Sequence, residues 1–186
     1  MNDEDITARL EECHTSGYCW ALACCGRDPV EAEEVLQTVY VKVLDGRAHF
    51  RGESSFRTWF FALIRRTAAD SRRRHVVRSL LRLRVAELGG REVVSEHPDD
   101  ALVRGETRQA FLRALARLPR RQREALELVF YHDMSVEAAA AVMRVTVGAA
   151  RQHYERGKRR FRQVLEESEV SYVADWRARE HAEEVR

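Results

Sequence analysis

Apolar side chains recur at steps of three and four residues, and this spacing most constrains what the chain can fold into. Ile6, Leu10 and Cys13 begin one such run, which continues to Cys24 and predicts a first helix with a break near Gly17. Three prolines and nine glycines in 186 residues leave little room for long loops. The sequence therefore predicts an all-helical protein.

A second helix is predicted to begin at Asp28, an N-cap residue that stands directly before Pro29. Its apolar stripe is Ala32, Val35, Leu36, Val39 and Val43. The valines at 39, 41 and 43 also alternate, and the Asp45-Gly46 turn after them would suit a β-hairpin. The cap and the three- and four-residue steps favour the helix.

A third helix is predicted after Ser54 or Ser55, either of which can cap it. Its aromatic residues have helical spacing and are interpreted as core: Phe56, Trp59 and Phe60. Arginines lie among them, and a mixture of rings and cations suits single-stranded nucleic acid. The candidate contact residues are Arg51, Arg57, Arg65 and Arg66.

Charge is distributed in blocks, which divide the chain into two helical domains. Residues 46–84 hold 11 basic and 2 acidic side chains, and residues 150–165 hold 6 basic and 1 acidic. Between them, residues 85–107 hold 6 acidic and 2 basic side chains and contain Gly89-Gly90 and Pro98, which indicates a linker. Two separate basic blocks suit a polyanion that is held at two places.

The second half of the chain has the helix-turn-helix pattern. A short helix is predicted to begin at the N-cap Ser135, a tight turn to follow at residues 144–146, and Thr146 to cap a longer helix. The inward side of the longer helix is predicted to be Val147, Ala150, Tyr154, Gly157 and Phe161.

The opposite face of that helix carries Arg151, Gln152, Glu155 and Arg156. Arginine and glutamine read guanine and adenine edges in the major groove, so this face is a candidate for duplex recognition. An ordinary solvated helix face is the alternative, and the preceding short helix and turn favour DNA reading.

Composition excludes several classes of protein. No run approaches the ~20 apolar residues that span a bilayer, and the acidic start Asp3-Glu4-Asp5 is unlike a signal peptide, so we expect no membrane insertion and a cytoplasmic protein. Neither a catalytic motif nor a cofactor-binding motif is present, so we expect no enzyme activity and no cofactor. The four cysteines Cys13, Cys19, Cys24 and Cys25 lack C-x-x-C spacing and are interpreted as core filling, not as a metal site.

Several motifs together resemble the extracytoplasmic-function sigma factors of bacterial RNA polymerase. Ala32 to Tyr40 resembles the motif that docks on the polymerase clamp helices, and Phe50-Arg51-Gly52 with Ser55 to Trp59 resembles the part that melts and reads the minus-ten element. Leu118 to Glu124, with Val147-Gly148, resembles the region that reads the minus-thirty-five duplex. The resemblance covers nearly all of both domains.

The resemblance implies three sets of site residues. Core-polymerase binding falls on Glu33, Glu34, Gln37 and Thr38. Minus-ten recognition falls on Arg51, Arg57, Arg65, Arg66 and Arg73. Minus-thirty-five recognition falls on Arg151, Gln152, Glu155, Arg156 and Arg159. Implied partners are core RNA polymerase, through its clamp helices and flap, promoter DNA and an anti-sigma factor.

The resemblance also implies a division into four segments. These are a region-two-like domain at 1–84, the linker at 85–107, a region-four-like domain at 108–167 and a C-terminal tail at 168–186. Two positions depart from the family pattern: Arg66 stands where asparagine is usual, and Arg144 stands at a turn position where glycine is common. The alternatives are a stand-alone helix-turn-helix regulator and a cysteine-based redox or metal sensor.

Overall fold

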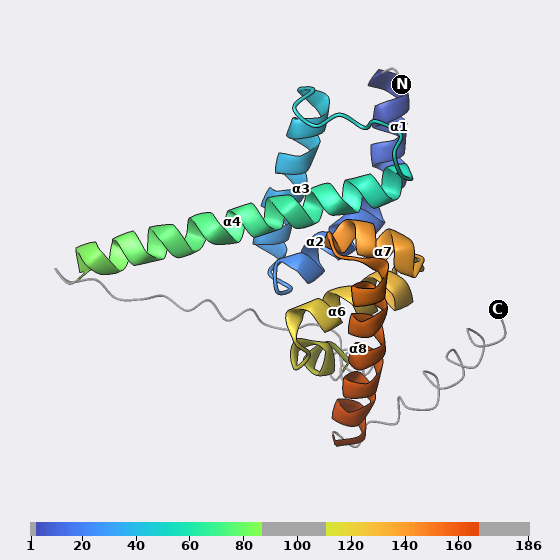
Figure 1. Ribbon diagram of the computed structural model, residues 1–186. Coiled ribbons are helices and arrows are strands. Elements are labelled where there is room, and N and C mark those ends of the chain that lie inside the picture. Colours follow the sequence, from blue (N-terminus) through green and yellow to red (C-terminus); the bar gives the residue numbers. More distant parts are fainter. Residues whose placement is uncertain (1–2, 87–110, 168–186) are drawn as a thin grey trace, which may run out of the picture.

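The computed structural model describes residues 3–86 and 111–167, and the regular elements in those two stretches are all helical (Figure 1). The all-helical prediction is therefore confirmed. In chain order the elements are α1 (Asp3–Glu12), α2 (His14–Cys24), α3 (Pro29–Leu44), α4 (Phe56–Ala86), α6 (Arg120–Leu126), the π-helical segment η1 (Glu127–Tyr131), α7 (Val136–Met143) and α8 (Val147–Glu167). Residues 111–116 are also helical. Most of the predicted linker and all of the predicted tail lie outside the described residues.

The first helical run breaks at Cys13, between α1 and α2, and the prediction of a break near Gly17 was wrong. Gly17 lies inside α2, where it is buried against α4. A Cβ atom at position 17 would lie 2.6 Å from Cε1 of Phe60. The glycine therefore serves close helix packing and does not interrupt the helix.

Local capping sets the boundaries of α3 and α4 as predicted. The Asp28 carboxylate accepts hydrogen bonds from the backbone N–H groups of Val30 (2.9 Å) and Glu31 (3.0 Å). The hydroxyl of Ser55 accepts a hydrogen bond from the backbone N–H of Thr58 at 3.2 Å, one residue before α4 begins. Because α3 continues to Leu44, the β-hairpin alternative is excluded.

The long helix α4 is buried on more than one side. Phe56 and Phe60 belong to the core, as predicted, and so do Phe61 and Ile64, which the predicted stripe did not include. The reason is that α2 and α3 pack on one part of α4 and α7 packs on another (Figure 1). A helix that is covered by two layers needs a wider apolar surface than a helix with one buried face.

The second half folds into a helix-turn-helix unit. The Ser135 hydroxyl accepts a hydrogen bond from the backbone N–H of Ala138 at 3.1 Å, and Thr146 caps α8 through the N–H of Ala149 at 3.2 Å. Arg144 adopts φ 55° and ψ 52°, so the turn keeps the left-handed conformation without a glycine. Val147 does not point inward as predicted: it is 40% exposed at the first position of α8.

The crossing of α8 over α6 depends on Gly157, which gives a first prediction. A Cβ atom at position 157 would lie 2.9 Å from the backbone oxygen of Gln122, and a backbone atom cannot move aside cheaply. We expect Gly157→Ala to lower the free energy of unfolding by ~1–3 kcal/mol, as measured by urea denaturation. Gly148→Ala is the matched control, because Gly148 lies in the same helix with open space around it. That variant should be neutral or stabilising by up to ~1 kcal/mol, and an equal loss in both variants would contradict the packing argument.

Candidate nucleic-acid interface

An open groove of about 640 Å³ lies between the end of α3, the loop after it and the N-terminal third of α4. Four cationic side chains of the first half of the chain line it: Lys42, Arg47, Arg51 and Arg66. A fifth, Arg144, comes from the turn of the helix-turn-helix unit. Glu53 is the only acidic residue in this lining. The groove is thus suited to a polyanion.

Ring faces stand beside these cations. The ring of Phe50 lies 5.5 Å from the rings of both Phe56 and Trp59, between centroids. Phe56 is buried, whereas Trp59 is half-buried and lines the groove together with Phe50 and His49. The interpretation of Trp59 as core alone is therefore incomplete. Aromatic faces next to cations can hold unstacked bases and their phosphates.

Lys42 is held in place at the wall of the groove. Its Nζ donates a hydrogen bond to Oγ1 of Thr67, a buried residue of α4, at 3.0 Å. Burial lowers the pKa of the Lys42 ammonium group, and the neighbouring Arg74 and Arg66 lower it further, against Asp70, which raises it. An ammonium group among other cations gains when a phosphate joins them, because the phosphate relieves their mutual repulsion.

The five arginines predicted for minus-ten recognition do not gather in one place. Arg51 and Arg66 line the groove. Arg57 lies over the ring of Phe61, with its guanidinium carbon 5.3 Å from the ring centroid, and Arg65 pairs with Glu124 at 3.1 Å. Arg73 is exposed further along α4 and is not among the groove residues.

Three groove cations were missed from the sequence. Lys42 lies in the last turn of α3, and Arg47 follows Gly46 in the loop that leads to Phe50. Both stand close in sequence to the aromatic loop, and that proximity was the available signal. Arg144 gave no such signal, because only the packing of the two halves brings it to the groove.

The outer face of α8 is exposed to solvent. All five residues predicted for duplex recognition are exposed: Arg151, Gln152, Glu155, Arg156 and Arg159. The opposite face carries Ala150, Tyr154, Gly157 and Phe161, all buried. One side of α8 is therefore fixed in the core, and a row of polar side chains is presented to solvent on the other side.

The outer face of α3 differs in chemistry from the groove and from the outer face of α8. Glu33, Glu34 and Gln37 are exposed, and Thr38 is half-buried beside them. Large apolar residues on the same helix are also exposed: Val30, Val41 and Leu44. Acidic and apolar side chains together suit a protein partner better than a polyanion.

The cysteines fill space in the first half of the chain. Cys24 and Cys25 are buried, Cys13 and Cys19 are half-buried, and all four are free thiols. Burial raises the pKa of the Cys24 thiol well above its usual value and that of Cys25 to about 12, so neither is a ready thiolate. Across residues 3–86 and 111–167 no three side chains of the metal-binding kind come together.

The fold and these surfaces define a two-part helical nucleic-acid-binding protein with a helix-turn-helix unit, and comparisons with known proteins agree. Residues 17–77 match the profile "Sigma-70 region 2", and residues 108–161 match "Sigma-70, region 4". RNA polymerase sigma factor CarQ of Myxococcus xanthus is 30% identical over 169 residues, which span 90% of this chain and 91% of CarQ. RNA polymerase sigma-H factor of Pseudomonas aeruginosa is 29% identical over 145 residues, 75% of each chain.

A solved structure has the same fold. The sigma factor RpoE of Bartonella quintana, crystallised with the anti-sigma factor NepR, superposes with a TM-score of 0.67 over 88% of this chain and 98% of the RpoE chain, at 22% identity. The chain belongs to the extracytoplasmic-function group of RNA polymerase sigma factors. It is a promoter-specificity factor for transcription initiation, a role that is generally not enzymatic, and neither the stand-alone regulator nor the cysteine sensor is favoured.

Proposed function

We propose that the groove beside α4 holds the melted minus-ten strand and that the outer face of α8 reads the minus-thirty-five duplex. The observation that carries this proposal is the composition of the groove, in which the cationic side chains of Lys42, Arg47, Arg51 and Arg66 line the same open space as the half-buried Phe50 and Trp59. Single-stranded bases need ring faces and phosphates need cations, and this groove offers both within one open space. Arg66 replaces the usual asparagine there, so the base preference differs from that of relatives with asparagine.

The roles of the other two surfaces follow from their chemistry. The α8 face offers Arg151 and Gln152 near the start of a helix, from where side chains reach base edges in the major groove. The α3 face, with Glu33, Glu34 and Gln37 beside exposed valines, docks on the clamp helices of core polymerase. The flap is the expected second contact on the polymerase.

The remaining partners and the location follow from this role. An anti-sigma factor is a partner of the kind that RpoE has in its crystal structure. None of the helices in the described parts of the chain is long and apolar enough to cross a bilayer. The chain acts in the cytoplasm, where the polymerase is, and carries out no catalysis of its own.

Transcription reconstituted from purified core polymerase, with and without this chain, tests the proposal. We expect promoter-specific initiation only with the chain present. The chain alone should bind promoter DNA weakly, and its affinity should fall steeply between 50 and 200 mM salt, because phosphate contacts supply most of the binding. Tight sequence-specific binding by the free chain, at nanomolar concentration, would contradict the proposed dependence on polymerase.

Charge reversal on the α3 face gives a further prediction. Glu34→Arg should weaken association with core polymerase about tenfold, whereas stability should change by less than ~0.5 kcal/mol, because Glu34 is exposed. The measurement is titration of core polymerase with a fluorescent chain. Glu11→Arg, an equal change at an exposed position on α1, is the control and should bind as the unaltered chain does. If both variants bound core polymerase with equal affinity, α3 would not be part of the docking surface.

A further inference from the structure

A small apolar groove lies between the helical stretch 111–116 and the segment η1, and we call it the η1 groove. It shares no residue with the groove beside α4 or with the outer face of α8. Its volume is about 70 Å³. Sites for small molecules usually measure ~300–1,000 Å³, so this groove suits a side chain of a polypeptide. The apolar and aromatic residues that line it are Phe111, Leu112, Leu115, Leu126, Phe130 and Tyr131.

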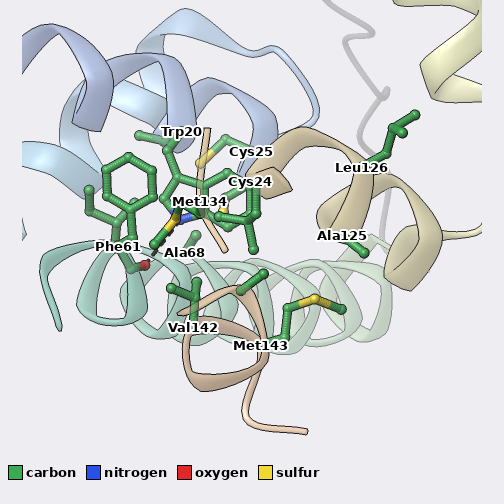
Figure 2. Packing of buried hydrophobic residues seen from close by; sticks show 14 of the residues in the cluster. Trp20, Cys24, Cys25, Phe61, Ala68, Ala125, Leu126, Met134, Val142 and Met143 are labelled. Carbon is green, nitrogen blue, oxygen red and sulfur yellow. Dashed lines mark hydrogen bonds between the residues drawn. The ribbon is translucent and has the colours of Figure 1, made fainter. Parts of the chain in front are cut away.

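The lining of the η1 groove combines buried and exposed side chains. Leu115 and Leu126 are buried, and Figure 2 shows Leu126 pointing away from the cluster around Trp20 and Phe61. Tyr131, in contrast, is 58% exposed, and Phe130 beside it is half-buried. Exposed ring surface around an apolar hollow is typical of a site that another segment covers, whereas a single exposed ring is ordinary.

The end of α8 lies close to the η1 groove. The rings of Phe111 and Phe161 meet edge-on with 5.0 Å between centroids, and further along both helices Arg117 pairs with Glu167 at 3.6 Å. The two helices therefore run side by side in the same direction. Glu167 is the last residue of α8, so the chain leaves α8 beside the end of the helix that carries the groove residues. The distance back from Arg117 to Phe111 is only ~9 Å, at ~1.5 Å per helical residue.

The segment that follows α8 is long enough to reach the η1 groove and has the side chains to fill it. Residues 168–176 contain three large apolar side chains and two acidic ones, without a basic residue: Tyr172, Val173, Trp176, Glu169 and Asp175. An extended chain spans ~3.3 Å per residue, so Tyr172 can lie up to ~17 Å from Glu167 and Trp176 up to ~30 Å. Both lengths exceed the ~9 Å along the helix, which leaves enough chain to turn back.

Charge favours the same occupant. The carboxylate of Glu127 lies in the lining of the η1 groove but is only 4% exposed, and it accepts a hydrogen bond from Nη2 of Arg27 at 2.7 Å. Arg27 is 38% exposed, and Arg113 is exposed on the helix that carries the groove residues. The accessible charge around the η1 groove is therefore positive, which complements Glu169 and Asp175.

We propose that residues 168–176 fold back onto the η1 groove and seat the ring of Trp176 on its apolar lining. A segment tethered this close has an effective concentration in the millimolar range, so it prevails over a free partner of equal affinity. The segment then covers Tyr131 and Phe130 and braces the helix at 111–116 against η1. This docking is independent of the proposed promoter and polymerase contacts, because it uses none of their residues.

Photo-crosslinking of the full chain tests the docking. The photoreactive p-benzoylphenylalanine replaces Tyr131, an exposed aromatic position that tolerates a larger ring. After irradiation and trypsin digestion, we expect the crosslink on the peptide 163–177, in material that migrates as a monomer. A crosslink to the peptide 92–104 would mean that the chain between the two halves fills the groove, and a crosslinked dimer would mean that a second copy does. Either result, or no crosslink, would overturn the proposal.

A matched position and a reciprocal probe complete the test. The same photoreactive residue in place of Leu44, which is 62% exposed on α3, should give no crosslink to 163–177, and an equal yield there would overturn the proposal. If the chain altered at Tyr131 is unfolded by circular dichroism, the probe replaces Trp176 and should crosslink to the peptides 109–113 or 124–144. A reciprocal crosslink elsewhere would overturn the docking.

Removal of the Trp176 ring tests which side chain occupies the η1 groove. With the probe at position 131, Trp176→Ala should lower the crosslink yield about tenfold, because a buried aromatic anchor dominates a contact of this size. Val185→Ala is the control, an apolar residue of the same segment outside 168–176, and it should leave the yield unchanged. Equal yields from the two variants would overturn the seating of Trp176.

Discussion

Arg66→Ala should change the preference at the minus-ten element and leave the upstream preference as it was, whereas Arg151→Ala should do the reverse. Arg66 lines the groove with Phe50 and Trp59, and Arg151 is exposed near the start of α8, so under the proposed function each side chain is expected to contact a different form of DNA. Loss of a bidentate base contact costs ~1–3 kcal/mol, which corresponds to about five- to 150-fold in relative promoter strength.

Two promoter libraries measure this division, one randomised in each element, transcribed with each variant and with Arg113→Ala as a control. Arg113 is exposed in the helical stretch 111–116 and lies in neither surface. Its variant should keep both preferences. If Arg66→Ala altered only the upstream preference, or Arg151→Ala only the downstream one, the assignment of the two surfaces would be wrong.

Glu124→Ala should lower the free energy of unfolding by about 3 kcal/mol, a large loss for the removal of one charged side chain. The Glu124 carboxylate is buried and accepts hydrogen bonds from Arg65 and, at 2.8 Å, from Nε of Arg120. Its removal leaves Arg65, whose side chain is only 13% exposed, as a charge without its partner, and such losses cost ~3–5 kcal/mol when fully buried. Urea denaturation followed by circular dichroism measures the change.

Glu167→Ala is the matched control for that variant. Its ion pair with Arg117 is long, at 3.6 Å, and both side chains are more than half exposed. An exposed pair of this kind contributes ~0–1 kcal/mol. Similar losses of stability in the two variants would mean that burial does not increase the contribution of the Glu124 ion pair to stability.

Local sequence signals determined where the helices begin and end. The caps Asp28, Ser55, Ser135 and Thr146 work over two or three residues, so each is readable without knowledge of the fold. The helix-turn-helix pattern, the outer face of α8 and the acidic face of α3 follow from helical periodicity for the same reason.

The predictions that failed concern contacts between distant segments. Gly17 reads as a helix break in the sequence, yet it lies inside α2 because Phe60 of α4 needs the space. Phe61 and Ile64 join the core because two layers cover α4, and Trp59 lines the groove together with Phe50, whose ring lies 5.5 Å away between centroids. These arrangements depend on tertiary packing, which cannot be read from the residues next to each position in the sequence.

The sequence by itself determined the helices, the two basic blocks and the resemblance to sigma factors, because caps, periodicity and charge all act within a few residues. Only the tertiary structure decided which arginines share a site. Arg51 and Arg66 meet in the groove with Arg144, whereas Arg65 is paired with Glu124, 59 positions along the chain. An arginine at an exposed position and one in a buried ion pair look alike in sequence, because what distinguishes them is the carboxylate that packing brings within hydrogen-bond distance.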